Sequence, residues 1–291
     1  HYTEKQMRNL RGNVMSMIFQ DPLETLNPTI PVGRQIMEVI LKHQKVSKAE
    51  AKARALELLQ LVGIEQAADR FALQPHFFSG GMRQRCVIAA ALAANAKLLF
   101  ADEATTALDV TVKAKILDLL LELREKTGVA IVFVTHDLGS VARIADRVAV
   151  MYAGKVVETG TAEDIFYDPR HPYTWGLLSS LPSLAVEDGV LRYIPGTPPS
   201  LLNPPPGDAF AVRNEYALAI DYEQMPPMFR ISDTHYAASW LLDARAPRIR
   251  YAFNLSAYRY GSRPATIPHC MSSAAAPVTN GVAIEVPVRD A

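Results

Sequence analysis

The sequence predicts an α/β fold built around a parallel, doubly wound sheet. Short apolar segments of about four to eight residues alternate along the chain with longer segments whose apolar residues recur at helical spacing. Alternation of this kind is typical of strands joined by helices that cover the faces of one sheet. We expect strands over residues 14–19, 97–101, 129–134, 147–151 and 155–158, and helices over 32–43, 47–62, 110–126 and 137–145.

Local signals justify individual elements. The first strand runs into the loop Gln20–Leu23, and Ser47 with Glu50 forms a capping box at the start of the second helix. Another helix begins after Phe78-Ser79-Gly80-Gly81, and Gly154 is a turn residue between the last two strands.

Composition excludes several classes of protein. With 291 residues, 49% hydrophobic and 21% charged, the chain is long enough for about two globular domains. Lys plus Arg and Asp plus Glu both number 30, which argues against a nucleic-acid partner. Two cysteines, Cys86 and Cys270, do not make a disulfide framework and fit a reducing compartment. Neither a secretion signal nor an apolar run of the length of a membrane span is visible, so we expect membrane association through a partner.

The C-terminal part has a different composition. Seven prolines lie within residues 182–207, which predicts an extended segment leading to an accessory region. Residues 251–291 contain no lysine and have no usable periodicity, and we expect a disordered tail or one that is foreign to the fold.

Two adjacent acids, Asp102 and Glu103, follow the apolar segment 97–101. Ligands bind at the carboxyl edge of an open α/β sheet, and neighbouring strand residues point to opposite sides. We therefore expect Asp102 to hold Mg²⁺ through water and Glu103 to orient or deprotonate a water in phosphoryl transfer. Taken alone, the pair is also typical of a solvated acidic turn.

A second motif is Ser79-Gly80-Gly81-Met82-Arg83-Gln84-Arg85. Glycines at a helix start let a phosphate approach the backbone, where free N–H groups and the helix dipole favour an anion. Ser79 is a helix cap that is also able to donate its hydroxyl to a phosphate. A serine followed by two glycines alone is equally typical of a flexible turn.

Three further polar residues end predicted elements. His136 follows a strand and lies 136 − 103 = 33 residues after Glu103, which places it one strand over at the same sheet edge. There it is suited to sense a phosphate and orient water, although a lone histidine in that place is usually structural. Asp109 and Gln20, each taken alone, are typical of a helix cap and a polar strand end.

In combination, these motifs resemble the ATP-binding subunits of ATP-binding-cassette (ABC) transporters over roughly residues 10–250. The resemblance implies a P-loop NTPase-like core with an inserted helical subdomain, and it implies ATP and Mg²⁺ as ligands, with Asp102 and Gln20 at the metal. It implies these roles: Gln20 the Q-loop glutamine, Asp102 the Walker B aspartate, Glu103 the catalytic glutamate, Asp109 the D-loop, His136 the switch histidine, and Ser79, Gly80, Gly81, Met82 and Gln84 the signature that contacts ATP of a second subunit.

The segments FQDPLETLNPT, HPYTWGLLSSLPS and IPGTPPSLLNPPPGDAF further resemble the D-type ATPases of oligopeptide and dipeptide permeases. Some members of that family hold an iron–sulfur cluster on four cysteines in the C-terminal extension. The matching positions here are Asp208, Asn214, Asp221 and Ser239, so we expect no iron–sulfur cluster.

The resemblance implies a domain order and two departures. We expect a core remnant over 1–21, a helical subdomain over 22–95, a RecA-like core over 96–160, a permease-type extension over 161–250 and the tail over 251–291. Ala104 replaces the usual proline after the catalytic glutamate, which we expect to leave Glu103 less well held and to slow hydrolysis. No GxxxxGK followed by Ser or Thr occurs, so we expect a truncated chain without the P-loop and inactive alone.

The implied protein is the ATPase of a bacterial importer of oligopeptides or dipeptides on the cytoplasmic side of the membrane. Its implied partners are a second ABC ATPase subunit, two transmembrane permease subunits and, through the complex, a solute-binding protein. Three alternatives stay open: the ATPase of a nickel or other small-solute importer, a degenerate non-catalytic subunit, and an ABC-type ATPase that acts on DNA or the ribosome.

Overall fold

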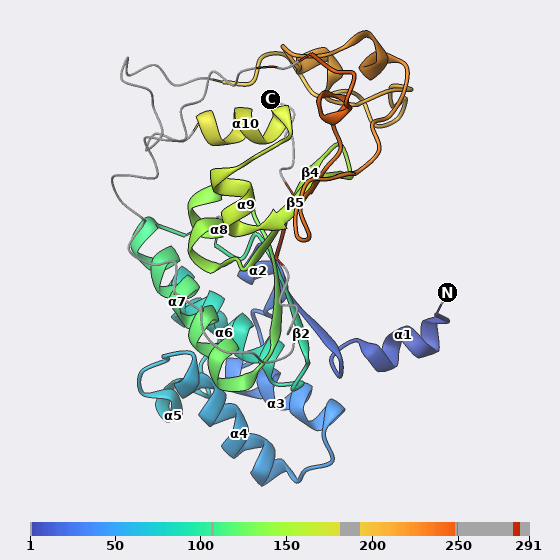
Figure 1. Cartoon of the computed structure of the whole chain (residues 1–291). Helices are drawn as coiled ribbons and strands as arrows, with labels where there is room; N and C mark the ends of the chain where they lie inside the picture. Colours follow the sequence, from blue (N-terminus) through green and yellow to red (C-terminus); the bar gives the residue numbers. More distant parts are fainter. Residues whose placement is uncertain (1, 106–107, 181–192, 248, 250–281, 286–291) are drawn as a thin grey trace. The chain divides into compact units, whose positions relative to one another are not determined.

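A computed structural model describes residues 2–105, 108–180, 193–247, 249 and 282–285 (Figure 1). The chain forms two compact units, residues 1–135 and residues 136–291, and each is described by itself. Among the described residues, no helix combines the length and apolar character that crossing a membrane requires.

The first unit contains a parallel sheet of three strands in the order β1 (Met15–Ile18), β2 (Leu98–Asp102) and β3 (Ala130–Val134). Asp102 pairs with Val134 at the carboxyl edge. One face of the sheet is buried, because alternate strand residues point to the same side. The residues of that face are Ile18, Leu99, Ala101, Ile131 and Phe133. The predicted parallel α/β core is therefore confirmed in this unit.

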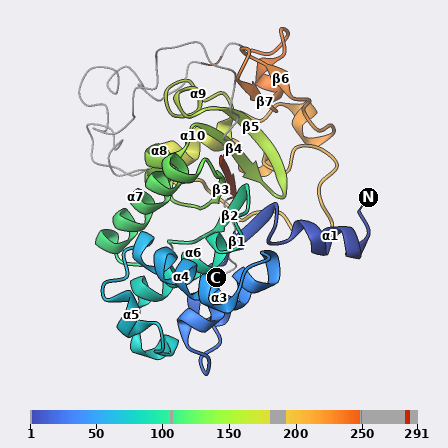
Figure 2. The ribbon, with the colours of Figure 1, turned by 90° about the horizontal axis from the view of Figure 1, so that it is seen from below.

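Seven α-helices are described in the first unit. Three of them, α3, α4 and α6, pack against one another and are seen from below in Figure 2. The predicted capping box is confirmed, since Ser47 accepts from the Glu50 N–H and the Glu50 carboxylate accepts from the Ser47 N–H. The bounds are α1 Glu4–Leu10, α2 Pro22–Thr25, α3 Val32–His43, α4 Lys48–Leu61, α5 Ala67–Arg70, α6 Gly80–Leu92 and α7 Val110–Thr127, with a 3₁₀ turn, η1, over Pro75–Phe77.

The second unit contains a separate sheet of mainly antiparallel strands, in the order β6-β7-β5-β4-β8, where β8 is Val282–Glu285. Strands β4 (Arg147–Tyr152) and β5 (Lys155–Thr161) form a hairpin whose turn places Gly154 at φ 76°. The expectation that these two strands belong to the parallel sheet is wrong, because a two-residue turn joins antiparallel neighbours and leaves no room for a crossover. Strands β6 (Phe229–Arg230) and β7 (Tyr236–Ala237) extend the sheet beside β5.

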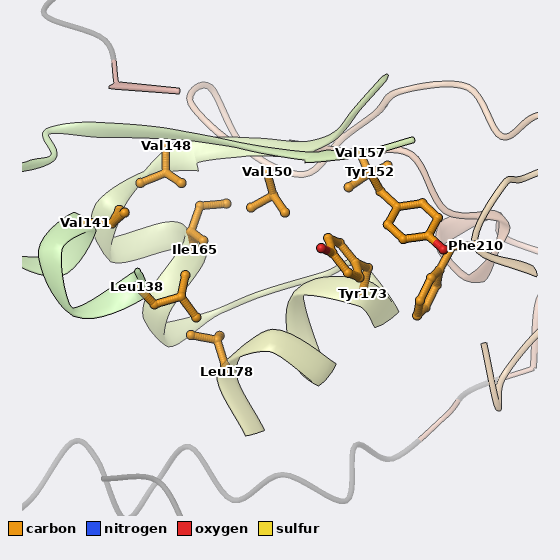
Figure 3. Packing of buried hydrophobic residues seen from close by; sticks show 10 residues of the cluster. All are labelled: Leu138, Val141, Val148, Val150, Tyr152, Val157, Ile165, Tyr173, Leu178 and Phe210. Atoms are coloured by element: carbon orange, nitrogen blue, oxygen red, sulfur yellow. The ribbon is translucent and has the colours of Figure 1, made fainter. Parts of the chain in front are cut away.

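The helices of the second unit cover one side of the hairpin. They are α8 (Leu138–Ile144), α9 (Ala162–Tyr167) and α10 (Pro172–Ser179), and three 3₁₀ turns follow: η3 (Ala211–Arg213), η4 (Ala219–Tyr222) and η5 (Trp240–Leu242). Figure 3 shows the apolar core between the hairpin and these helices, with the rings of Tyr152, Tyr173 and Phe210 at one end. Aromatic pairs of this kind stabilise beyond their buried area. Tyr152 and Tyr173 have ring centroids 4.7 Å apart.

The accessory region and the tail are described in part. Residues 193–207 of the proline-rich segment contain neither helix nor strand, as the composition predicts, while residues 181–192 lie outside the described residues. Within the tail, Val282–Glu285 form β8, which pairs in parallel with β4. These four residues thus differ from the expected disorder, and the other residues of the tail, 251–281 and 286–291, lie outside the described residues.

Candidate active site

The carboxyl edge of the first unit's sheet brings together two of the predicted residues. Gln20 follows β1 and Glu103 follows β2, 83 positions apart in sequence, and the Gln20 Nε2 donates a hydrogen bond of 2.8 Å to the Glu103 Oε2. Because parallel strands end at the same edge, residues that follow neighbouring strands meet there. The structure therefore joins the expected Q-loop glutamine to the expected catalytic glutamate.

The backbone of Glu103 has a rare conformation. Its φ is 45°, in the left-handed region that side-chain-bearing residues seldom adopt. Its N–H donates to the Val134 carbonyl at 2.9 Å, and its side chain is only 8% exposed. Strained residues of this kind cluster at functional sites. The next residue, Ala104, is buried, and its effect on turnover stays a prediction.

Asp102 and Gln20 supply the chemistry that a magnesium ion requires. Asp102 ends β2 and is half-buried, and Gln20 is exposed at the end of β1. Mg²⁺ prefers oxygen ligands, and a carboxylate with an amide oxygen offers them. Since Gln20 donates through Nε2, its oxygen points away from that hydrogen bond. Both residues thus offer oxygen ligands of the kind that the ion prefers, and their expected binding of Mg²⁺ stays a prediction, since no described group of three or more His, Cys, Asp and Glu side chains forms a protein-only metal site.

The start of α6 has the features expected of an anion site. Ser79 is the N-cap, and its Oγ accepts from the Met82 N–H at 3.4 Å. Space is open at Gly80, where a Cβ would meet no atom within 4 Å. Free N–H groups in the first turn of a helix bind anions. Gln84 differs from these residues because it is buried, at 1% exposure, and its expected contact with ATP stays a prediction.

Asp109 and His136 cap or precede helices. Asp109 is the N-cap of α7 and accepts from the Val112 N–H at 2.9 Å. His136 is exposed and begins the second unit, directly before Asp137, the N-cap of α8. His136 and Glu103 belong to different units, so the expectation that they lie close together at one sheet edge stays a prediction.

A buried glutamate in the second unit was not predicted from the sequence. Glu158 of β5 is 0% exposed, and its carboxylate accepts from the Arg170 N–H at 2.5 Å and the His171 N–H at 3.1 Å. Its Oε1 also lies 2.8 Å from the Nε2 of His235, which is 1% exposed. The strand KVVETGT also contains Lys155 and two threonines, so its sequence gives no signal that Glu158 is buried.

The four positions expected to lack an iron–sulfur cluster are all buried. The side chain of each accepts a hydrogen bond from one backbone N–H. The donors are Phe210 for Asp208, Tyr216 for Asn214, Leu218 for Asp221 and Leu241 for Ser239. Burial raises the pKa of Asp208 to about 6, and the nearby Asp221 adds to this shift. These side chains stabilise turns, and the absence of a cluster stays a prediction.

Two family models match the chain. The model described as "ABC transporter" matches residues 1–106, and that described as "Oligopeptide/dipeptide transporter, C-terminal region" matches residues 157–220. The first of these matches covers the parallel core with the helix-start motif and the acid pair, and it identifies the class of protein as an ABC ATPase.

Relatives extend this likeness over most of the chain. The oligopeptide transport ATP-binding protein OppD of Bacillus subtilis (strain 168) is 62% identical over 85% of this chain and 69% of its own length. The dipeptide transport ATP-binding protein DppD of Lactococcus lactis subsp. cremoris (strain MG1363) is 57% identical over 87% of this chain and 73% of its own length. The solved structure of cbiO1 from Clostridium perfringens, part of the ABC transporter complex cbiONQ, is 29% identical and matches with a TM-score of 0.52 over 58% of this chain and 64% of that one.

The chain belongs to the oligopeptide/dipeptide family of ABC transporter ATP-binding subunits. Membership supports nucleotide binding and ATPase activity for the full-length protein.

Proposed function

We propose that the full-length protein hydrolyses ATP to drive uptake of oligopeptides or dipeptides. The observation that best supports the proposed ATP hydrolysis is the hydrogen bond of 2.8 Å between Gln20 and Glu103 at the carboxyl edge of the parallel sheet. It places a carboxylate and an amide together beside Asp102, a grouping suited to phosphoryl transfer. The peptide substrate is supported by the C-terminal region model over residues 157–220 and by the names of the relatives.

Glu103 is the proposed general base. A carboxylate within hydrogen-bond reach of a water accepts its proton as the oxygen attacks, a contribution of about 10²–10⁴-fold in rate. Gln20 orients this carboxylate by donating to Oε2, and the N–H bond to Val134 fixes the backbone of Glu103. His136 is proposed to orient the same water, on the family resemblance alone.

Asp102 and the Gln20 amide oxygen would hold Mg²⁺, and the start of α6 would hold phosphate oxygens. When bound, Mg²⁺ would polarise the phosphoanhydride bond of ATP. The Ser79 hydroxyl and the N–H groups near Gly80 are proposed to bind the ATP of a second ABC subunit, because the space at Gly80 is open. Asp109 is proposed to lie at the same subunit interface.

The remaining assembly follows from the family. We propose that the protein dimerises with a second ABC ATPase and docks on two permease subunits at the cytoplasmic side of the membrane, with a solute-binding protein delivering the substrate. Because the sequence holds no GxxxxGK followed by Ser or Thr, we propose that this chain alone has no measurable turnover.

The test of the chemistry is Glu103→Gln in the full-length protein assembled with its permease. We expect turnover to fall at least about 100-fold while ATP binding is retained, because the amide keeps the shape but does not accept a proton. Glu125→Gln is the matched control, since Glu125 is exposed on α7. Unchanged turnover in Glu103→Gln would remove Glu103 from the role.

The test of the substrate is uptake by cells that lack the chromosomal gene and carry it on a plasmid. We expect restored uptake of labelled di- or oligopeptides and no change in nickel uptake. Restored nickel uptake without peptide uptake would favour the small-solute alternative, and a full-length protein that restores neither would favour the non-catalytic one.

A further inference from the structure

The two glycines at the start of α6 lie in different surroundings. A Cβ added to Gly80 would meet nothing within 4 Å, whereas one added to Gly81 would lie 2.7 Å from Cγ1 and 3.6 Å from Cγ2 of Val112. Neither glycine is among the described residues with a positive φ. The requirement at Gly81 is therefore for space and not for a special backbone conformation.

Val112 cannot easily move to make room for a side chain at position 81. It is half-buried in the first turn of α7, and a β-branched side chain in a helix has one strongly preferred χ1 rotamer. Rotating it away from an added methyl group would leave that rotamer. The side chain of Val112, in the first turn of α7, therefore packs in the space that a side chain at position 81 would occupy.

The backbone of Val112 also holds the cap of α7. Its N–H donates to the Asp109 Oδ1 at 2.9 Å, and the next N–H, that of Lys113, donates to the Asp109 carbonyl at 2.8 Å. One residue therefore contacts the start of α6 through its side chain and fixes Asp109 through its backbone. All of these residues lie in the first unit.

We propose that Gly81 is a packing seat, a position where the missing side chain lets Val112 pack against the start of α6, so that Val112 sets the position of Asp109 relative to Ser79. Val112 is a positioning residue in this scheme, which rests on the proposed function for its effect on the reaction. A displacement of the α6 start is then passed to Asp109 through a direct steric contact within one subunit.

The first measurement is thermal unfolding of the 291-residue chain. Alanine favours helix over glycine, so Gly80→Ala is expected to keep or raise the Tm. Gly81→Ala is expected to lower the Tm by several degrees, because overpacking outweighs the gain in helix propensity. Adding Val112→Ala to Gly81→Ala is expected to restore the Tm. Val110→Ala is the matched control, since Val110 lies on the same helix at 85% exposure and relieves no contact.

The second measurement is ATPase activity of the full-length protein in its transporter. We expect Gly81→Ala to lose about 10-fold or more and the double variant with Val112→Ala to recover most of it, while the double variant with Val110→Ala does not recover. A Gly81→Ala Tm equal to that of Gly80→Ala would overturn the packing seat. A restored Tm without restored activity would overturn the positioning role and make Gly81 a ligand-contact residue.

The two proposals fail differently. If the wild-type complex hydrolyses no ATP, or Glu103→Gln hydrolyses it normally, the proposed function fails while the Tm pattern still decides the packing at Gly81. If Glu103→Gln is inactive and the Tm pattern is absent, only the inference about Gly81 and Val112 fails.

Discussion

Each unit of the molecule buries a glutamate, and the two are held in different ways. Glu103 in the first unit has a left-handed φ of 45°, follows a strand end, and accepts a hydrogen bond from the side chain of Gln20. Glu158 in the second unit lies within strand β5 and accepts from two backbone N–H groups as well as pairing with His235. Both side chains are buried, at 8% and 0% exposure.

The difference indicates two kinds of buried acid. Backbone donors are fixed by the fold, so a carboxylate that they hold joins segments together and is not released during a reaction. A side-chain donor on an exposed residue is able to move, and backbone strain is typical of functional sites. We infer that Glu103 serves chemistry and that Glu158 holds the second unit together, by joining β5 to the segment before α10 and to the segment that contains β7.

The largest expected effect on stability comes from Glu158→Gln. The amide keeps the volume but replaces one acceptor oxygen by a donor, which then faces a backbone N–H or the Nε2 of His235. Each buried group left without its hydrogen-bond partner costs about 1–3 kcal/mol, so the total expected loss is about 3–5 kcal/mol. The measurement is the free energy of unfolding from urea denaturation at pH 7.

Glu163→Gln is the control for this prediction, because Glu163 is exposed in the first turn of α9. A loss below about 1 kcal/mol for Glu158→Gln would show that the three donors find other partners, and the contrast between the two glutamates would then be lost.

The next effect concerns His171 and its dependence on pH. Burial lowers the pKa of His171 from 6.5 to about 3, while its Nδ1 accepts from the Tyr173 N–H. The unfolded chain then binds a proton that the folded chain rejects, so stability falls as the pH drops from about 6.5 toward 3. The contribution amounts to about 3 kcal/mol between pH 7 and pH 4.

His171→Asn tests it, since asparagine is a good N-cap and does not titrate. We expect the free energy of unfolding of this variant to fall less between pH 7 and pH 4 than that of the wild type. Equal losses in the two proteins would contradict a buried neutral histidine.

The smallest effect has the opposite sign and concerns Asp208. Burial first, and then Asp221, raise the pKa of Asp208 from 3.8 to about 6. The folded chain binds this proton more tightly than the unfolded chain, so Asp208 destabilises the fold as the pH rises from about 4 to 6. Asp208→Asn keeps an acceptor for the Phe210 N–H and is expected to add about 1–3 kcal/mol of stability at pH 7.

The gain from Asp208→Asn should shrink to about 0.5 kcal/mol near pH 4, where the folded carboxyl is protonated and the unfolded one is nearly half protonated. Measuring both variants at pH 7 and pH 4 separates this acid from the histidine. A gain that does not change with pH would mean that the substitution acts through packing.

The elements that the sequence predicted depend on local signals. The capping box at Ser47 and Glu50, the cap Ser79 and the cap Asp109 all use residues within one helical turn, and the structure has each of them. Apolar runs likewise predicted every strand of the first unit, with the acid pair at the end of β2.

The features that the sequence did not predict depend on residues far apart. The hydrogen-bond partners of Glu158 lie 12, 13 and 77 residues away in sequence, and no pattern in β5 predicts them. The left-handed backbone of Glu103 is likewise set by its surroundings, since glutamate has no preference for that region. The antiparallel pairing of β4 with β5 is not given by the apolar period of either strand, and it follows instead from the two-residue turn that joins them.

The most direct test compares Glu103→Gln with Glu158→Gln in the same full-length protein, with ATPase activity and unfolding free energy measured for both. The account predicts that Glu103→Gln loses at least about 100-fold in turnover with stability close to that of the wild type. It predicts that Glu158→Gln loses several kcal/mol of stability, with turnover near that of the wild type at temperatures where it stays folded. Loss of turnover without loss of stability in Glu158→Gln, or the reverse pattern in Glu103→Gln, would contradict the division between a chemical and a structural glutamate.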